Sequence, residues 1–149
     1  MVAQAFPFRI AVIGNPETPS ALVIGNFLDR LTERTSRRGR SVAIHACESA
    51  GPLLPLVRAH AKKRGWAFTV HPSGVAAMLA ACDAVAAVPG VPDRATWDAV
   101  ETAAANGLPV RVLMRAPLPA ALVGFPRVLA VSPDICREKD LKIPSGLYY

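Results

Sequence analysis

The chain has few cysteines, few charged residues and no long apolar run. Its three cysteines, Cys47, Cys82 and Cys136, are far apart and form no C-x-x-C pair, so we expect neither disulfides nor a metal site. No stretch reaches about 18 uninterrupted apolar residues, and no basic segment precedes an apolar run at the N-terminus. We therefore expect a cytoplasmic protein with no membrane contact, no metal and no cofactor.

The overall composition is typical of a globular protein with a basic net charge. Hydrophobic residues make up 52% of the 149 residues and charged residues 19%, which favours one domain with heavily buried strands. The net charge of +6 is compatible with attraction to nucleic acid or to phosphorylated small molecules. Much of the excess charge is expected in a loop that contains Arg34, Arg37, Arg38 and Arg40.

The most informative part of the chain predicts a strand, a loop, a helix and a second strand. Residues 84–88 form an apolar run without alternation, which is typical of a strand buried on both faces. We expect the next helix to have Thr96 as its N-cap and to end at Asn106-Gly107, before a strand over residues 110–114. This order places the loop of residues 89–96 at the carboxyl edge of a parallel sheet, where ligands bind in α/β proteins.

The preceding segments repeat the alternation of strand and helix. Strands are predicted over residues 9–13, 41–46 and 66–70, and the first helix is expected to have Thr18 as its N-cap. The pattern predicts a doubly wound, mainly parallel, five-stranded sheet in three α/β/α layers over residues 1–115.

The last segment, residues 116–149, differs in character because it is rich in proline. We expect it to be a C-terminal extension packed on the same domain or used in a homodimer. One extra strand could form within it at residues 127–131.

The region from residue 8 to residue 114 also carries a spacing known from a protein superfamily. Met78, Asp83, Pro89, Gly90 and Thr96 match a run in which a methionine and an aspartate precede a strand and P-G-G-x-G-T follows it. The chain resembles a divergent member of the SLOG superfamily, which includes the LONELY GUY phosphoribohydrolases, also known as lysine-decarboxylase-like proteins. The resemblance implies a Rossmann-like fold and a nucleotide site bounded by residues 14–20, by residues 89–96 and by the turns after the second and third strands.

The resemblance does not extend to the catalytic groups of those hydrolases. The family carries an arginine four residues before the methionine, where Gly74 stands, and a glutamate three residues after the threonine, where Ala99 stands. The loop of residues 89–96 also lacks two of the glycines and is two residues longer. The resemblance therefore implies the fold more strongly than N-glycosidic hydrolysis.

Two loops at the expected crevice carry residue types that bind anions. Glycines before a helix allow close approach and leave backbone N–H groups free for phosphate. The alternative is that these glycines only make turns and that the threonines only cap helices. Neither a P-loop nor a G-x-G-x-x-G motif is present. The residues predicted to bind the ligand are Gly14, Asn15, Thr18, Ser20, Ser73, Gly74, Pro89, Gly90, Arg94 and Thr96.

Three functions remain open at this point. The first is binding of a nucleotide or nucleotide-derived small molecule in a sensing or carrier role. The second is an enzyme that acts on nucleotides or nucleosides, as an N-glycosidic hydrolase or transferase, with Glu17 and Asp98 as weak catalytic candidates; both also fit first-turn acids. The third is a nucleic-acid-binding module that uses the arginine-rich loop, on the edge opposite the crevice.

His45 and His71 are two further candidates for acid and base chemistry. Each follows or ends a predicted strand and could point towards the crevice, where an imidazole can exchange protons near neutral pH. The alternative for each is a structural or solvent-facing histidine.

Overall fold

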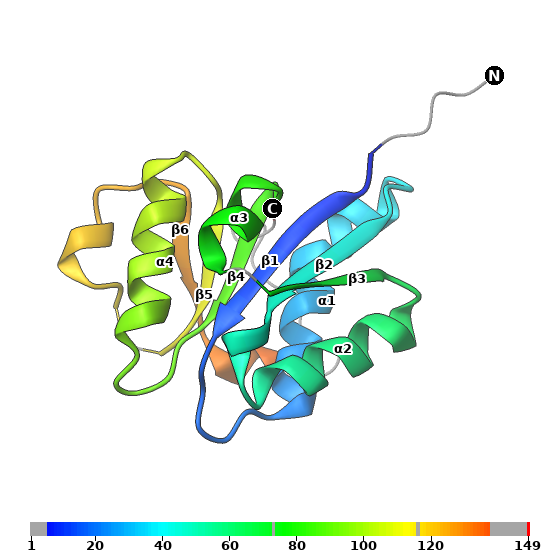
Figure 1. Cartoon of the computed structure of the whole chain (residues 1–149), viewed down its shortest axis with the longest axis horizontal. Coiled ribbons are helices and arrows are strands. Elements are labelled where there is room, and N and C mark those ends of the chain that lie inside the picture. Colours follow the sequence, from blue (N-terminus) through cyan, green and yellow to red (C-terminus); the bar gives the residue numbers. More distant parts are fainter. Residues whose placement is uncertain (1–5, 73, 116, 138–148) are drawn as a thin grey trace.

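Six parallel strands form one sheet in the order β3-β2-β1-β4-β5-β6 (Figure 1). The computed structural model describes residues 6–72, 74–115, 117–137 and 149. The order runs outwards in both directions from the central pair β1 and β4, which is the doubly wound arrangement. The predicted α/β class is confirmed. The strands are β1 (Phe8–Gly14), β2 (Val42–Cys47), β3 (Ala67–His71), β4 (Ala84–Val88), β5 (Val110–Leu113) and β6 (Val128–Val131).

Helices cover both faces of the sheet. On one face, α1, α2 and the short helix η3 pack against a core that contains Ile10, Ile44 and Val131. On the other face, α3, α4 and the short helix η2 pack against a core that contains Ile13, Val85 and Val112. The helices are α1 (Ala21–Arg37), η1 (Glu48–Ala50), α2 (Leu53–Arg64), α3 (Val75–Ala80), α4 (Arg94–Ala105), η2 (Ala120–Leu122) and η3 (Pro133–Cys136).

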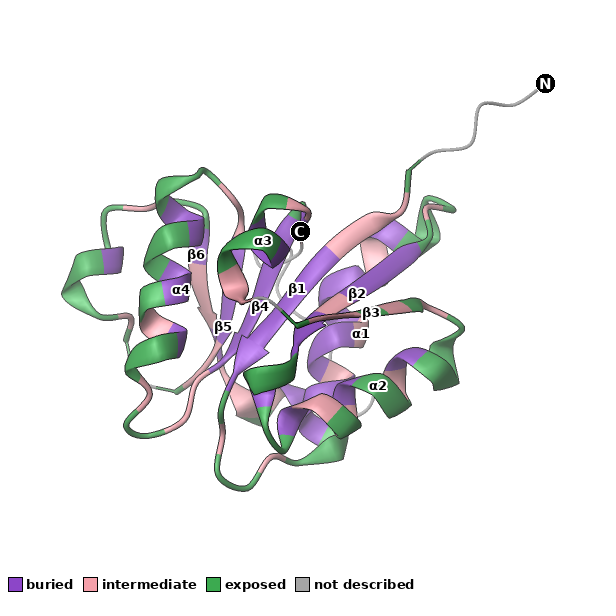
Figure 2. Ribbon diagram, in the orientation of Figure 1, coloured by how far each residue is buried: buried purple, intermediate pink, exposed green. Residues whose placement is uncertain are grey.

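Strand β4 lies at the centre of the sheet and is buried along its whole length (Figure 2). Its residues Ala84, Ala86 and Ala87 have no exposed surface, and Val88 is 6% exposed. This confirms the buried strand that the sequence predicts. Small side chains on both faces let the helical layers approach the sheet closely, since protein interiors are packed without large voids.

The sheet has one strand more than the five predicted. β6 pairs with β5 along four residues, from Val110 opposite Val128 to Leu113 opposite Val131. Val128 joins the core on one face of the sheet and Val131 the core on the other. β6 therefore makes part of the segment 116–149 a component of the sheet. Within the predicted extension, residue 116 and residues 138–148 lie outside the described residues.

Helix α1 begins later and ends later than the sequence predicts. Its N-cap is Ser20, whose hydroxyl accepts a hydrogen bond from the Val23 amide at 3.3 Å, whereas Thr18 lies in the exposed loop before it. The helix continues to Arg37, so the first arginines of the expected basic loop lie in its last turn. Cations are favoured there by the helix dipole, and Arg37 also pairs with Glu33.

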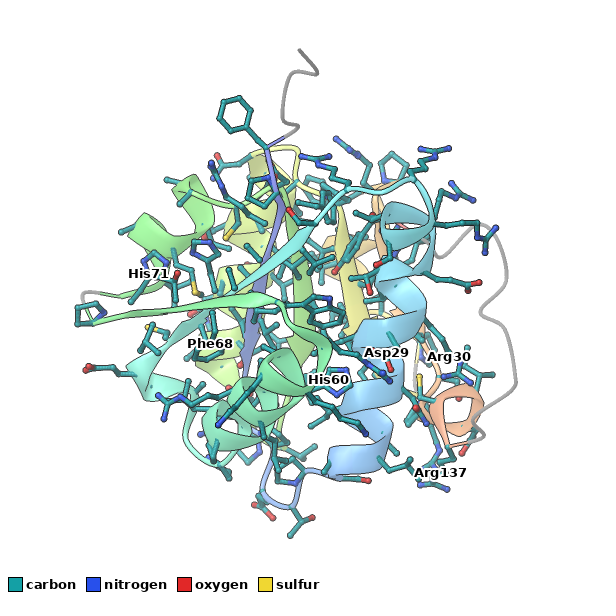
Figure 3. All side chains as sticks on the ribbon, turned by 90° about the vertical axis from the view of Figure 1, so that its right-hand side faces the viewer. Asp29, Arg30, His60, Phe68, His71 and Arg137 are labelled. Atoms are coloured by element: carbon teal, nitrogen blue, oxygen red, sulfur yellow. The ribbon has the colours of Figure 1, made fainter. Side chains whose placement is uncertain are left out.

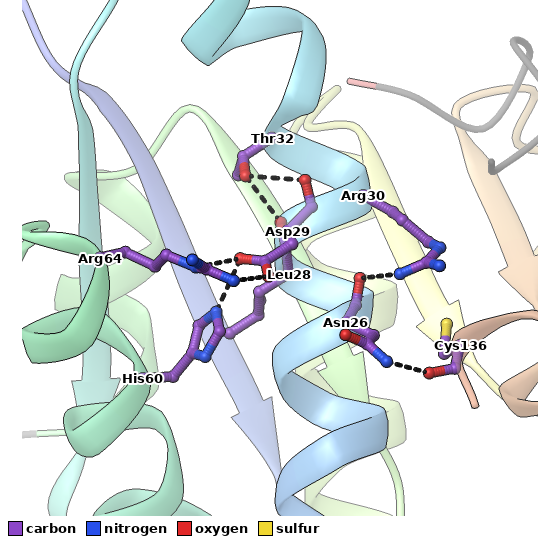
Figure 4. A network of polar contacts seen from close by, with 8 residues as sticks. All are labelled: Asn26, Leu28, Asp29, Arg30, Thr32, His60, Arg64 and Cys136. Atoms are coloured by element: carbon purple, nitrogen blue, oxygen red, sulfur yellow. Dashed lines mark hydrogen bonds and ion pairs between the residues drawn. The ribbon is translucent and has the colours of Figure 1, made fainter. Parts of the chain in front are cut away.

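A polar network joins α1 to α2 (Figure 4). The Asp29 carboxylate accepts hydrogen bonds from Arg64 at 2.6 and 3.1 Å and lies 2.7 Å from Nε2 of His60. Burial alone would raise the pKa of Asp29, but the hydrogen bonds from His60 and Arg64 outweigh it and hold the pKa below its ordinary value. His60 therefore has a structural role, and it also packs edge-on against Trp66.

The helices give no sign of a membrane segment. Within the described part of the chain, none combines the length and apolar character that a membrane crossing requires.

Candidate functional site

A cavity of about 120 Å³ opens at the carboxyl edge of the sheet, where β1 and β2 end and α4 begins. This edge faces the bottom of Figure 1, where the β1 arrowhead points. The connections from β1 to β2 and from β4 to β5 lead to opposite sides, so the loops after β1 and β4 flank the topological switch point of the sheet. Gly14, Asn15 and Asp93 of these two loops line the cavity. Four chain segments line it: Val12 to Asn15; Cys47, Ser49 and Ala50; Val75; and Asp93, Ala95, Thr96 and Ala99.

Two glycines bring the loops after β1 and β4 into direct backbone contact. A Cβ on Gly14 would lie 2.0 Å from the carbonyl oxygen of Val88, and Gly14 has a φ of 147° that other residues rarely adopt. A Cβ on Gly90 would lie 2.3 Å from the carbonyl oxygen of Asn15. Both glycines are therefore needed for contact between the loops, which supports the turn-forming alternative for these positions.

The carboxylate of Asp93 gathers hydrogen bonds from both loops. Its Oδ2 atom accepts from the Asn15 amide at 3.1 Å, from the Gly90 amide at 2.9 Å and from the Thr96 hydroxyl at 2.6 Å. Its Oδ1 atom accepts from the Thr96 amide at 3.2 Å. One side chain thus caps α4 and ties the two loops together.

This arrangement corrects the predicted start of α4. Asp93 is the N-cap, and Thr96 is the third residue of the helix and is 5% exposed. A carboxylate is favoured over a hydroxyl at this position because it is an anion at the positive end of the helix dipole. The hydroxyl of Thr96 donates to Asp93 and is not free for a ligand.

The hydrogen bonds also fix the charge of Asp93. Burial alone would raise its pKa, but donors from Gly90, Thr96 and Asn15 outweigh burial and hold the pKa below its ordinary value. The side chain is therefore an anion at neutral pH. Its oxygen atoms accept hydrogen bonds from backbone amides that we expected to bind a ligand.

No protein-family model matches the chain. A search of the curated proteins found no match either. The resemblance to the SLOG superfamily therefore stays a prediction from the residues.

The structure brings three of the predicted ligand-binding residues to the cavity. Gly14, Asn15 and Thr96 line it, while Gly74 is the N-cap of α3. The side chain of Arg94 is 92% exposed and lies 3.4 Å from Asp98. Thr18 and Ser20 are exposed in or next to the loop before α1, Pro89 and Gly90 are half-buried, and Ser73 lies outside the described residues.

The cavity is also lined by residues that were not predicted individually from the sequence. Ser49 and Ala50 reach it from η1, and Ala95 reaches it from the first turn of α4. Ser49 and Ala50 belong to the turn after the second strand, which the resemblance placed at the boundary of the site. The spacing of an aspartate three residues before a threonine could have revealed the Asp93 cap, because side chains at N-cap and N3 positions commonly interact.

Neither weak catalytic candidate lines the cavity itself. Glu17 is exposed in the loop between β1 and α1. Asp98 is exposed on α4, where it pairs with Arg94. It lines a groove between α3 and α4 that shares Val75, Ala95 and Ala99 with the cavity. Among the described residues that line the cavity, Asp93 is the one with a carboxylate side chain.

His45 and His71 are partners of one another. Their Nδ1 and Nε2 atoms lie 2.7 Å apart, and the ring centroids are 5.0 Å apart. His71 ends the edge strand β3, as Figure 3 shows, and is in register with Cys47 of the cavity wall. Burial, His71 and Arg9 lower the pKa of His45, in that order, against the opposing effect of Asp83. Among the described residues, no group of three or more His, Cys, Asp or Glu side chains is placed to hold a metal ion.

The arginine-rich segment lies at the amino ends of the strands, away from the cavity. Arg40 donates to the carbonyl oxygen of Phe6 at 2.9 Å, stacks over the ring of Phe8 and lies 3.8 Å from Asp83. Arg37 is also engaged within the chain, because it pairs with Glu33.

Proposed function

We propose that the cavity at the carboxyl end of β1 binds a nucleotide or a nucleotide-derived small molecule, in a sensing or carrier role. The observation that supports the proposal is that the loops flanking the switch point of a doubly wound sheet, where ligands of such sheets bind, line the cavity. Its volume of about 120 Å³ is smaller than a typical ligand pocket of roughly 300 Å³ or more. One part of the ligand would therefore enter the cavity and the rest would lie over the open edge.

Binding is favoured over catalysis by the state of the polar groups in the cavity. A general base needs a free lone pair and a pKa near the working pH. Asp93 has four hydrogen-bond donors and a lowered pKa, and Thr96 donates its hydroxyl to Asp93. Neither side chain is therefore suited to proton transfer.

A homodimer and a cytoplasmic location are part of the same proposal. The large apolar side chains that a second copy would cover are those of Phe6, Leu22, Val91 and Val123, which have more than half of their surface exposed. The three cysteines are free and buried, which suits a reducing compartment. Analytical ultracentrifugation tests the dimer, and a single monomeric species at all concentrations would contradict it.

The test of ligand binding is a thermal-shift screen of nucleosides, nucleotides, cyclic nucleotides, ADP-ribose and NAD. A ligand that binds only the folded state must raise the melting temperature. Ala95 is exposed and lines the cavity, so Ala95→Trp places a large side chain at the cavity mouth. Ala105 is exposed at the other end of α4, so Ala105→Trp is the matched control. We expect one class of ligand to stabilise the wild type and the control but not Ala95→Trp.

Two results would contradict the proposal. One is the absence of a shift with every compound in the screen. The other is a shift of equal size in Ala95→Trp, which would place the ligand elsewhere on the protein.

A further inference from the structure

Asp93 gives the wall of the cavity a negative charge. Among the described residues that line the cavity, it is the one charged side chain, and the others are apolar or carry neutral groups, as in Asn15, Ser49 and Thr96. Like charges repel strongly where water is partly excluded. The cavity therefore disfavours an anionic group on electrostatic grounds alone.

The backbone geometry leads to the same conclusion. Phosphate binds at the carboxyl edge of such sheets through loop amides and the first turn of a helix. Here the amides of Asn15, Gly90 and Thr96 already donate to Asp93 at 2.9 to 3.2 Å. A phosphate at this point would have to displace a carboxylate that is part of the chain.

We propose that Asp93 determines the specificity of the site by occupying the position of a ligand phosphate. The group that enters the cavity is then uncharged, such as the sugar or base of a nucleoside-type ligand, and any phosphate stays outside near the exposed side chain of Arg94. This inference rests on the proposed function for the identity of the ligand. The role of Asp93 in excluding phosphate is tested separately below.

Two substitutions at the same position separate the charge of Asp93 from the space that it fills. Asp93→Ser keeps a capping oxygen for Thr96 but is too short to hold the amides of Asn15 and Gly90, so it leaves donors for an anion. Asp93→Asn removes the charge but fills the same space. Circular dichroism without ligand shows which variants are folded.

The experiment measures the affinity of inorganic phosphate, four nucleosides and their 5′-monophosphates for the wild type and both variants, by calorimetry and thermal shift. We expect the wild type to bind a nucleoside about as well as its monophosphate and not to bind phosphate. We expect Asp93→Ser to be stabilised by phosphate and to bind the monophosphate about tenfold more tightly than the nucleoside, since hydrogen bonds to a charged group are strong. Asp93→Asn should not gain phosphate binding.

The outcomes distinguish the two proposals. If the wild type binds a monophosphate at least about tenfold more tightly than its nucleoside, the inference is wrong and the proposed function stands. If the wild type binds no nucleoside or nucleotide but Asp93→Ser gains phosphate binding, the role of Asp93 stands and the proposed function is wrong. A folded Asp93→Ser that gains no phosphate binding would overturn the role of Asp93. If this variant does not fold, the comparison of nucleoside with monophosphate in the wild type decides the question.

Discussion

Asp29 and Asp93 both collect hydrogen bonds, but their donors differ in kind. Asp29 bonds to the side chains of His60 and Arg64 and joins two helices (Figure 4). Asp93 bonds mainly to backbone amides and joins two loops at the cavity. A long side-chain donor such as that of Arg64 can rotate towards water when its partner is lost, whereas the direction of a loop amide is fixed by the backbone. We therefore expect the two carboxylates to differ in their contribution to stability, although both have a lowered pKa.

The largest expected effect concerns the loop contact that supports Asp93. Gly14→Ala places a Cβ 2.0 Å from the carbonyl oxygen of Val88 at a φ of 147°, so the loops must separate. We expect a loss of about 3 kcal/mol or more in the free energy of unfolding, measured with urea. Gly39→Ala is the control, because Gly39 also has a positive φ of 77° but no atom lies within 4 Å of its Cβ position. Gly39→Ala should lower the free energy of unfolding by about 1 kcal/mol. Equal losses would show that the loop contact is loose.

The second prediction compares the two carboxylates directly. Asp93→Ala removes the α4 cap and leaves the amides of Asn15 and Gly90 without their acceptor, so we expect a loss of about 2 to 4 kcal/mol. Asp29→Ala should cost about 1 to 2 kcal/mol, because Arg64 is exposed enough to regain water. Urea unfolding at pH 7 measures both values. A larger loss of unfolding free energy for Asp29→Ala than for Asp93→Ala would contradict the expected order.

The smallest expected effect is the pH dependence of stability. The folded pKa of Asp93 is lowered, so its contribution is complete above the unfolded pKa of about 3.9 and is lost as the pH falls through the folded pKa. Urea unfolding of the wild type should therefore show decreasing stability below about pH 4. Asp93→Asn should show a weaker decrease over the same range, and so should Asp29→Asn. A profile of Asp93→Asn that runs parallel to the wild type would mean that Asp93 does not titrate with a lowered pKa.

Several features of the fold follow from local patterns and were predicted correctly. The apolar run of β4 has no alternation because both of its faces are covered, and this is visible in the residue types alone. The four-residue strand β6 was less evident, since it lies among prolines and turns and is too short for a period of two to stand out. Its place in the sheet depends on the exposed edge of β5, which is a tertiary feature.

The helix boundaries also depend on the tertiary structure. Thr18, Ser20, Asp93 and Thr96 are all acceptable caps by residue type. In the structure Ser20 and Asp93 are the caps, because their side chains accept hydrogen bonds from the amides of Val23 and Thr96. Residue types give the candidates, and the path of the folded backbone decides between them.

The sequence by itself determined the α/β class, the buried central strands and the edge of the sheet at which a site could form. Hydrophobic periodicity and glycine and proline positions are local properties, so one chain is sufficient to read them. The tertiary structure decided which polar groups meet: His45 with His71, and Asp93 with the amides of Asn15 and Gly90. These partners are up to 78 residues apart in the chain, and only the packing of the strands brings them within hydrogen-bonding distance.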